Sequence, residues 1–322
     1  MLNLLYRDSY SGIPVRNKCY PYPAVLVFEG AWNNPSLSTS RFFTALIRLT
    51  PPDHAMPTLK IPDSPDINYV RTGAKAGVPL FFIHALGLDL SVWEQQFSAF
   101  GSDHDLIAID LPGHGLSGAL NAPPSFAAMA RIVGKVIDHL HIGPVHLVGI
   151  SVGGMIAQAM AVTLPDLVRS LTLVATSCTF PAPVRNLLSE RAQLVRARGM
   201  EVIVPLHLER WFPQDFRQRR PDVLDRFAKI LFRQNPEFHA SMWDMVATLD
   251  IAHQLKTLRC PVMVVAGEED PSAAPAAGKR ITDQIDDARL VVIPASGHFP
   301  QMEYPAEFNH IMRAFIHQVE QA

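Results

Sequence analysis

Short apolar runs alternate with helix-like segments from residue 66 to the end of this 322-residue chain, and this alternation constrains the fold more than any other feature. Apolar runs of strand length fall at residues 79–83, 106–109, 144–148, 171–175, 261–266 and 290–293. After Ser125, apolar residues recur at helical spacing up to Leu140, which predicts an amphipathic helix. Further helices are expected at 152–164 and 306–319. Continuous apolar strands separated by helices are typical of a parallel sheet covered on both faces, so we expect an α/β fold with a mostly parallel central sheet flanked by helices.

The alternation is interrupted between residues 178 and 250. This stretch contains charged, helix-prone segments at 185–198 and 221–233 and no convincing strand. We interpret residues 178–250 as a helical lid that is inserted before the last two strands. The two parts of the core would then be residues 56–177 and 251–322.

Residues 1–55 differ from the rest of the chain, because they hold six prolines and scattered aromatic residues without a sustained period. The segment 56–63, which begins at Met56, resembles the start of a first strand. One hypothesis is therefore that Met56 is the true initiator. The rival hypothesis is a real N-terminal extension that covers a sheet edge or mediates assembly.

Composition excludes several classes of protein. The chain is 48% hydrophobic and 18% charged with a net charge of −2, which argues against disorder and against a basic nucleic-acid-binding face. Its three cysteines show no CxxC spacing, which favours a reduced, cytoplasmic chain over a disulfide framework. Residues 145–164 carry no charged side chain, but glycines interrupt them, so we predict no membrane span. No H-E-x-x-H cluster is present, and we expect no metal and no cofactor.

The sequence Gly-Ile-Ser-Val-Gly at residues 149–153 places Ser151 between an apolar strand and a helix. A G-x-S-x-G sequence in this context is typical of a nucleophile elbow, a sharp turn that presents the serine hydroxyl and has room only for small neighbours. The alternative is a glycine-rich helix start that serves close packing or binds an anion.

A serine nucleophile needs a base, and the base needs an acid that orients it. Of thirteen histidines, His298 is the best candidate, because it follows the strand at 290–293, and sites in open α/β folds form at the carboxyl ends of strands. His207, His239 and His253 lie in or next to the insertion, where a role in a pocket stays open. Asp270 follows the strand at 261–266 and is the candidate acid, with Glu268 and Glu269 as weaker rivals; residues 176–180, the other common position, contain no carboxylate.

An oxyanion would be held by backbone N–H groups. The N–H of Val152 follows the nucleophile directly, and Leu86 in the loop at 84–87 would supply the second donor. We expect His84 to brace that loop.

Taken together, these motifs resemble the α/β-hydrolase superfamily across residues 60–318, and within it the 3-oxoadipate enol-lactonases. The core residues that carry the resemblance are 85–93, 110–117 and 149–155, together with 267–270 and 297–298. In the insertion, Gly199-Met200 and Leu-Glu-Arg-Trp-Phe at 208–212 look like the enol-lactonase lid. The chain order Ser151, Asp270, His298 is also the order of the superfamily's triad.

The resemblance implies a serine hydrolase that cleaves a small carboxylic ester or lactone through an acyl-enzyme. It assigns the triad roles to Ser151, Asp270 and His298 and the oxyanion roles to Leu86 and Val152. Trp93 and Trp211 would face the substrate pocket, with ordinary packing as the alternative, and Arg210 would meet a substrate carboxylate unless it is a solvated lid residue.

The chain departs from the enol-lactonases at one point. They usually carry Asn-Ser before the Leu-Gly of the oxyanion loop, whereas this chain has His84-Ala85, as many general esterases and C–C hydrolases do. A C–C hydrolase of vinylogous diketones and a non-catalytic ligand-binding member of the fold therefore stay open. The expected partner is a small-molecule substrate, without nucleic acid or membrane, and a homo-oligomer is left open.

Overall fold

The computed structural model describes residues 58–75 and 77–322. The hypotheses on residues 1–55 and on Met56 lie outside this range. Within it, the chain builds one eight-stranded sheet whose strand order is β1-β2-β4-β3-β5-β6-β7-β8. The strands are β1 (Thr58–Leu59), β2 (Ile67–Gly73), β3 (Leu80–Ile83), β4 (Asp105–Ile109), β5 (Val145–Ile150), β6 (Val168–Val174), β7 (Val262–Gly267) and β8 (Arg289–Ile293). The strands from β4 to β8 pair in parallel, and β2 is antiparallel to both β1 and β4.

The predicted α/β fold and the six apolar strands are confirmed. Every residue of β3, β4, β5 and β7 is buried, as expected of strands covered on both faces. The prediction named no strand at β2, because this segment contains no continuous apolar run. Tertiary partners accommodate its polar residues: Asn68 Nδ2 donates to Asp110 Oδ2 at 2.7 Å, and the partly exposed Arg71 forms an ion pair with Asp105 at 2.7 Å.

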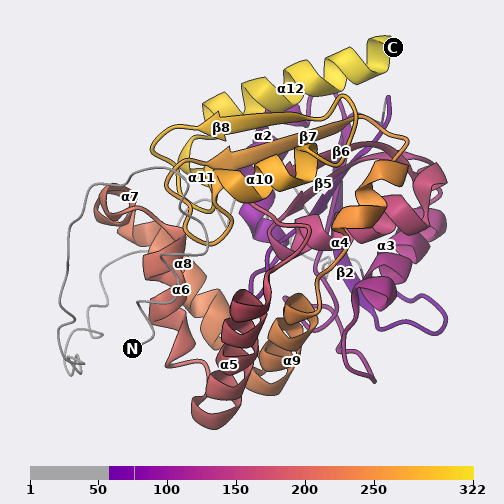
Figure 1. Ribbon diagram of the computed structural model, residues 1–322. Coiled ribbons are helices and arrows are strands. Elements are labelled where there is room, and N and C mark those ends of the chain that lie inside the picture. Colours follow the sequence, from indigo (N-terminus) through magenta and orange to yellow (C-terminus); the bar gives the residue numbers. More distant parts are fainter. Residues whose placement is uncertain (1–57, 76) are drawn as a thin grey trace, which may run out of the picture. The chain divides into compact units, whose positions relative to one another are not determined.

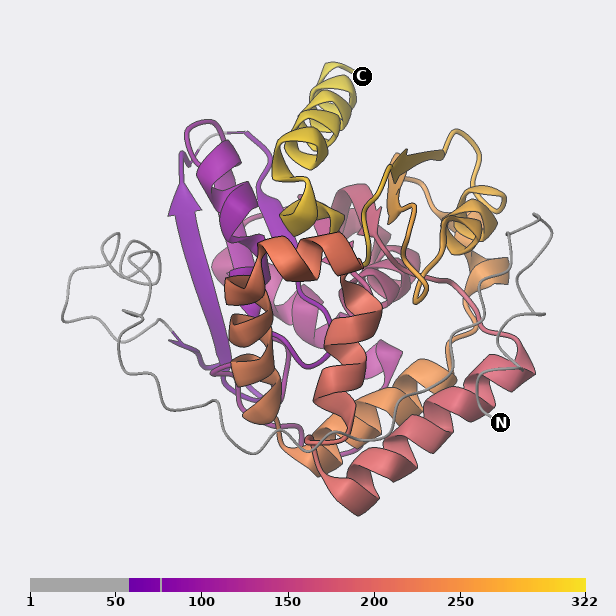
Figure 2. The ribbon, with the colours of Figure 1, turned by 90° about the vertical axis from the view of Figure 1, so that its left-hand side faces the viewer.

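Helices cover both faces of the sheet (Figures 1 and 2). On one face, α2 (Glu94–Phe100) packs with α12 (Pro305–Gln321) and the short α11 (Pro300–Glu303). On the other face, α3 (Phe126–Leu140) packs with α4 (Val152–Thr163), and α10 (Pro275–Thr282) contacts β7 and β8. The predicted helix after Ser125 is α3, and the Ser125 hydroxyl caps it by accepting from the Ala128 N–H at 3.2 Å.

Between β6 and β7 the chain forms five α-helices, followed by the 3-10 helix η3 (Ala252–Thr257), at the place where the sequence predicted a helical insertion. The α-helices are α5 (Ala182–Arg198), α6 (Ile203–Trp211), α7 (Gln214–Arg219), α8 (Pro221–Phe232) and α9 (Pro236–Ala247). Helices α5 and α9 lie side by side (Figures 1 and 2), and Arg196 on α5 pairs with Glu237 and Asp244 on α9.

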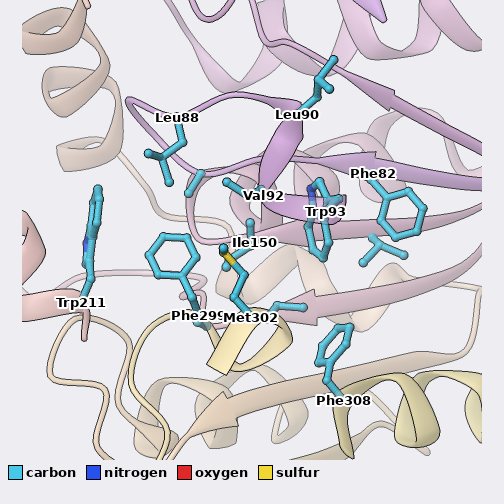
Figure 3. Packing of buried hydrophobic residues seen from close by; sticks show 14 of the residues in the cluster. Phe82, Leu88, Leu90, Val92, Trp93, Ile150, Trp211, Phe299, Met302 and Phe308 are labelled. Atoms are coloured by element: carbon cyan, nitrogen blue, oxygen red, sulfur yellow. The ribbon is translucent and has the colours of Figure 1, made fainter. Parts of the chain in front are cut away.

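One hydrophobic core cluster joins the sheet to this insertion. Phe82 and Trp93 lie in it with ring centroids 5.1 Å apart, and Phe299 stands between them and Trp211 (Figure 3). Phe299 also packs against Phe212 and Phe227 of the insertion at 5.3 and 5.0 Å. The insertion is therefore anchored by aromatic side chains directly beside the loop that carries His298.

Among the described residues, no helix combines the length and the apolar character that crossing a bilayer requires.

Candidate active site

Ser151 occupies a strained turn between β5 and α4. Its backbone angles are φ 53° and ψ −119°, a positive φ that non-glycine residues rarely adopt. Two contacts from the end of β6 hold this conformation: the Ser151 N–H donates to Val174 O at 2.9 Å, and the Thr176 hydroxyl donates to Ser151 O at 2.7 Å. The turn therefore has the geometry of a nucleophile elbow, with a partly exposed serine at its tip.

The glycines beside Ser151 are required by space. A Cβ on Gly149 would lie 2.4 Å from Gly153 O, and a Cβ on Gly153 would lie 2.4 Å from Ile83 O. Both contacts are with backbone, which cannot rotate away as a side chain can. The expectation that the elbow has room only for small neighbours is confirmed.

Asp270 and His298 are brought together by the loops that follow β7 and β8. His298 Nδ1 and Asp270 Oδ2 are 2.7 Å apart, and both side chains are buried. Because a carboxylate oxygen accepts, Nδ1 of the imidazole is the donor, which leaves Nε2 available as a base. The rival Glu268 instead accepts from the Ala295 N–H at 3.1 Å.

The sheet topology places the three candidate catalytic residues at one edge. Ser151 follows β5, Asp270 follows β7 and His298 follows β8, and these strands run parallel. The carboxyl ends of parallel strands meet at the same edge, where ligands bind in open α/β sheets.

The two predicted oxyanion donors lie at the same edge. Val152 is the first residue of α4, and Leu86 lies in the loop that follows β3, the neighbour of β5. Both residues are buried, and neither N–H donates to another of the residues that the structure describes. Two N–H groups of buried residues that have no acceptor in the described part of the chain are suited to bind a developing oxyanion.

His84 braces the loop at 84–87, as the sequence predicted. Its Nδ1–H donates to Ala85 O at 2.7 Å, and its Nε2 accepts from the Leu111 N–H at 2.9 Å. Burial lowers the pKa of this imidazole, so the ring is neutral and can make one bond of each kind.

The predicted pocket residues have different environments. The Trp211 ring lies parallel to that of His298, with centroids 6.1 Å apart, and its carbonyl accepts from the His298 N–H at 2.8 Å. Trp93 is fully buried beside Phe82 in the core (Figure 3). The Arg210 side chain donates to Ser272 Oγ at 3.0 Å and to Pro271 O at 2.5 Å, so it holds the loop that carries Asp270.

The two histidines of the insertion lie close to Trp211. His207 stacks between Trp211 and Trp243, with ring centroids at 4.5 and 5.7 Å, and His239 Nε2 accepts from the Trp243 indole at 3.2 Å. Burial lowers the pKa of both imidazoles, that of His239 to about 3, so both are neutral.

Sequence reasoning missed two residues that shape the site, Thr176 and Glu303. Thr176 lies in the segment after β6, where the expected catalytic side chain was a carboxylate, and Glu303 lies five residues beyond His298. The available signal for Glu303 was its spacing of five residues from His298. The short helix α11 lies between them and brings the Glu303 side chain back to the backbone of residues 297 and 299.

Within the described part of the chain, no three His, Cys, Asp or Glu side chains form a group that could hold a metal ion.

Comparisons with known proteins fit this geometry. The family described as alpha/beta hydrolase fold matches residues 78–305. The chain is 31% identical over 250 residues to 3-oxoadipate enol-lactonase 2 of Acinetobacter baylyi, covering 78% of this chain and 92% of the relative. It is 26% identical over 271 residues to 2-hydroxy-6-oxononadienedioate/2-hydroxy-6-oxononatrienedioate hydrolase of Burkholderia vietnamiensis, covering 78% of this chain and 90% of that one.

Among solved structures, the enol-lactonase from Burkholderia xenovorans matches with a TM-score of 0.76 and 26% identity, covering 81% of this chain and 99% of that chain. The chain belongs to the α/β-hydrolase family. The predicted resemblance to enol-lactonase-like members of that family is also confirmed.

Proposed function

We propose that this protein is a serine hydrolase that cleaves a small carboxylic ester or lactone through an acyl-enzyme. His298 Nε2 removes the proton from Ser151 Oγ, which attacks the carbonyl carbon, and the N–H groups of Leu86 and Val152 hold the resulting oxyanion. His298 then protonates the leaving oxygen. Water, deprotonated by the same imidazole, releases the acid and restores Ser151.

The observation that carries the proposal is the His298–Asp270 hydrogen bond at the sheet edge that also presents the strained Ser151. The buried carboxylate fixes the imidazole in the tautomer that a general base needs and stabilises the imidazolium that forms. The similarity to 3-oxoadipate enol-lactonase 2 supports an ester or lactone as the substrate class.

A hydrolysis screen of enol-lactones and 4-nitrophenyl esters tests the proposal, with Ser151→Ala as the informative variant and the exposed Ser98→Ala as its matched control. We expect Ser151→Ala to lose about 10³-fold or more in kcat/KM, because it removes the nucleophile, and Ser98→Ala to keep its activity. A fluorophosphonate probe should label the wild type and Ser98→Ala only. Absence of labelling in folded wild-type protein would refute the assignment of Ser151.

Hydrolysis of a C–C bond in a vinylogous diketone is the second candidate function. Two observations favour it: His84-Ala85 precedes the Leu-Gly of the oxyanion loop, and one relative is a hydrolase of 2-hydroxy-6-oxo dienedioates. Turnover of such a diketone, with no turnover of any ester or lactone in the screen, would favour this function over the first.

We further propose that the helices between β6 and β7 act as a lid over the site, with residues 178–250 as its extent and residues 56–177 and 251–322 as the core. The contacts of Trp211 and Arg210 with the loops of His298 and Asp270 support this role. A cytoplasmic location agrees with the two free cysteines of the described residues, Cys178 and Cys260.

A further inference from the structure

The carboxylate of Glu303 holds the backbone on both sides of His298. Its Oε2 accepts from the Gly297 N–H at 2.8 Å, and its Oε1 accepts from the Phe299 N–H at 2.9 Å. The N–H of His298 itself donates to Trp211 O at 2.8 Å. All three consecutive N–H groups around the candidate base are therefore bound, by Trp211 at the end of α6 and by Glu303 at the end of α11.

The fit of this loop leaves little room for rearrangement. A Cβ on Gly297 would lie 2.4 Å from Trp211 O and 3.3 Å from Glu303 Oε1. The carboxylate thus lies against the backbone of residue 297, and the insertion closes the other side of the loop. A loop fixed from both sides can hold the imidazole to within the small tolerance that proton transfer requires.

The Glu303 carboxylate has no basic side chain of lysine or arginine as an ion-pair partner among the described residues. The charged or titratable groups that face it are Asp270 and His298. Burial raises the pKa of this carboxyl to about 7, with the Asp270 carboxylate adding to the increase, while the two N–H bonds and His298 oppose it. Because burial disfavours the ionised form of this carboxyl, the position of Glu303 is not explained by contact with solvent.

We propose that Glu303 is a positioning residue for His298, whose ionised carboxylate keeps residues 297–299 in the conformation that aims the imidazole at Ser151. This inference rests on the proposed function. Protonation converts one acceptor oxygen into a donor, so one of the two flanking N–H groups loses its partner and the loop loosens. Activity should therefore fall as the pH drops through the range in which Glu303 gains its proton, because the loop around His298 is then released.

The test compares Glu303→Gln and Glu303→Asp with Glu307→Gln, which changes an exposed glutamate on α12. The substrate is 4-nitrophenyl butyrate, and kcat is expressed per site labelled by the fluorophosphonate, so unfolded protein does not enter the value. We expect Glu303→Gln to lower kcat about 10- to 100-fold with KM nearly unchanged, because the glutamine oxygen can replace only one of the two bonds. Glu303→Asp, which keeps the charge on a shorter side chain, should recover part of the loss.

The pH profile separates positioning from a general structural role. In the wild type and in Glu307→Gln, protonation of Glu303 should contribute to the acid limb of log kcat. This contribution should be missing in Glu303→Gln, so that its acid limb is less steep than that of the wild type. A kcat per labelled site within twofold of wild type, or an acid limb of unchanged steepness, would overturn the proposal.

A second readout does not depend on turnover. The Nδ1 proton of His298, shared with Asp270, should give a downfield proton resonance in the wild type that broadens or moves upfield in Glu303→Gln; an unchanged resonance would also count against the proposal. If wild-type protein shows neither hydrolysis nor labelling of Ser151, the proposed function itself fails. If it shows both and the Glu303 variants behave as wild type, only the role of Glu303 fails.

Discussion

At the scale of single residues, the glycines beside Ser151 indicate a close backbone contact whose other partner lies far away in the sequence. Gly153 has no neighbour in the sequence that explains its small size. The explanation is a strand about seventy positions earlier in the chain, since its missing Cβ would strike the carbonyl of Ile83 at the end of β3. Leu86 and Val152 lie close to this contact, because they follow β3 and β5, which are neighbouring strands of the sheet.

This close approach leads to a stability prediction. We expect Gly153→Ala to lower the free energy of unfolding by about 3 kcal/mol or more, because the added methyl overlaps backbone atoms that cannot move independently. The matched control is Gly143→Ala, whose Cβ would meet nothing within 4 Å although its φ is +64°. The control should cost about 1 kcal/mol, from the left-handed backbone alone. Equal losses for the two variants in urea unfolding would contradict this explanation.

At the scale of secondary-structure elements, the apolar runs were sufficient to predict six strands and the main helices of the core. The bounds agree because a buried strand and an amphipathic helix each produce a period that few other structures share. β2 could not be predicted in this way. Its polar residues Asn68 and Arg71 interrupt the apolar run, and their partners Asp110 and Asp105 lie about forty and thirty-four positions further along the chain.

Helix α6 carries Arg210, whose contacts differ from those that the resemblance implied. The resemblance suggested a substrate-binding role for Arg210, and the structure places its guanidinium on Pro271 and Ser272, next to Asp270. Together with the bond from the His298 N–H to Trp211 O, the end of α6 therefore contacts both loops that carry the candidate acid and base.

The substitution Arg210→Met distinguishes these two roles, since it keeps most of the aliphatic stem and removes the hydrogen bonds. If Arg210 holds the Asp270 loop, kcat should fall by about 3- to 10-fold for neutral and anionic esters alike, with about 1 kcal/mol lost in unfolding free energy. A rise in KM confined to carboxylate-bearing substrates would instead support direct substrate binding. Arg219→Met, on the exposed side of α7, serves as the control and should match the wild type.

At the scale of the folded core, stability should be concentrated in the middle of the sheet. β6 lies between β5 and β7, and Leu171 within it is fully buried, whereas β8 forms an edge and leaves Val292 37% exposed. The low charged fraction of the chain corresponds to this arrangement, in which both faces of most strands are covered.

We expect Leu171→Ala to lower the free energy of unfolding by about 3 kcal/mol, because it combines lost burial with a cavity in a closely packed layer. The edge substitution Val292→Ala should cost about 0.5 kcal/mol. Chemical unfolding followed by circular dichroism measures both values. Comparable losses at the two positions would mean that the sheet centre does not dominate stability.

The amino-acid sequence by itself determined the fold class, the helical insertion before the last two strands and the candidates Ser151, Asp270 and His298. These follow from local periods and from residues placed directly after strands, which a chain carries wherever its tertiary partners lie. The tertiary structure decided what depends on contacts between distant segments: the hydrogen bond that selects Asp270 over Glu268, the anchoring of Arg210 and the strand identity of β2. It also revealed Glu303 at the backbone of His298, because only the turn into α11 brings its carboxylate to the N–H groups of Gly297 and Phe299.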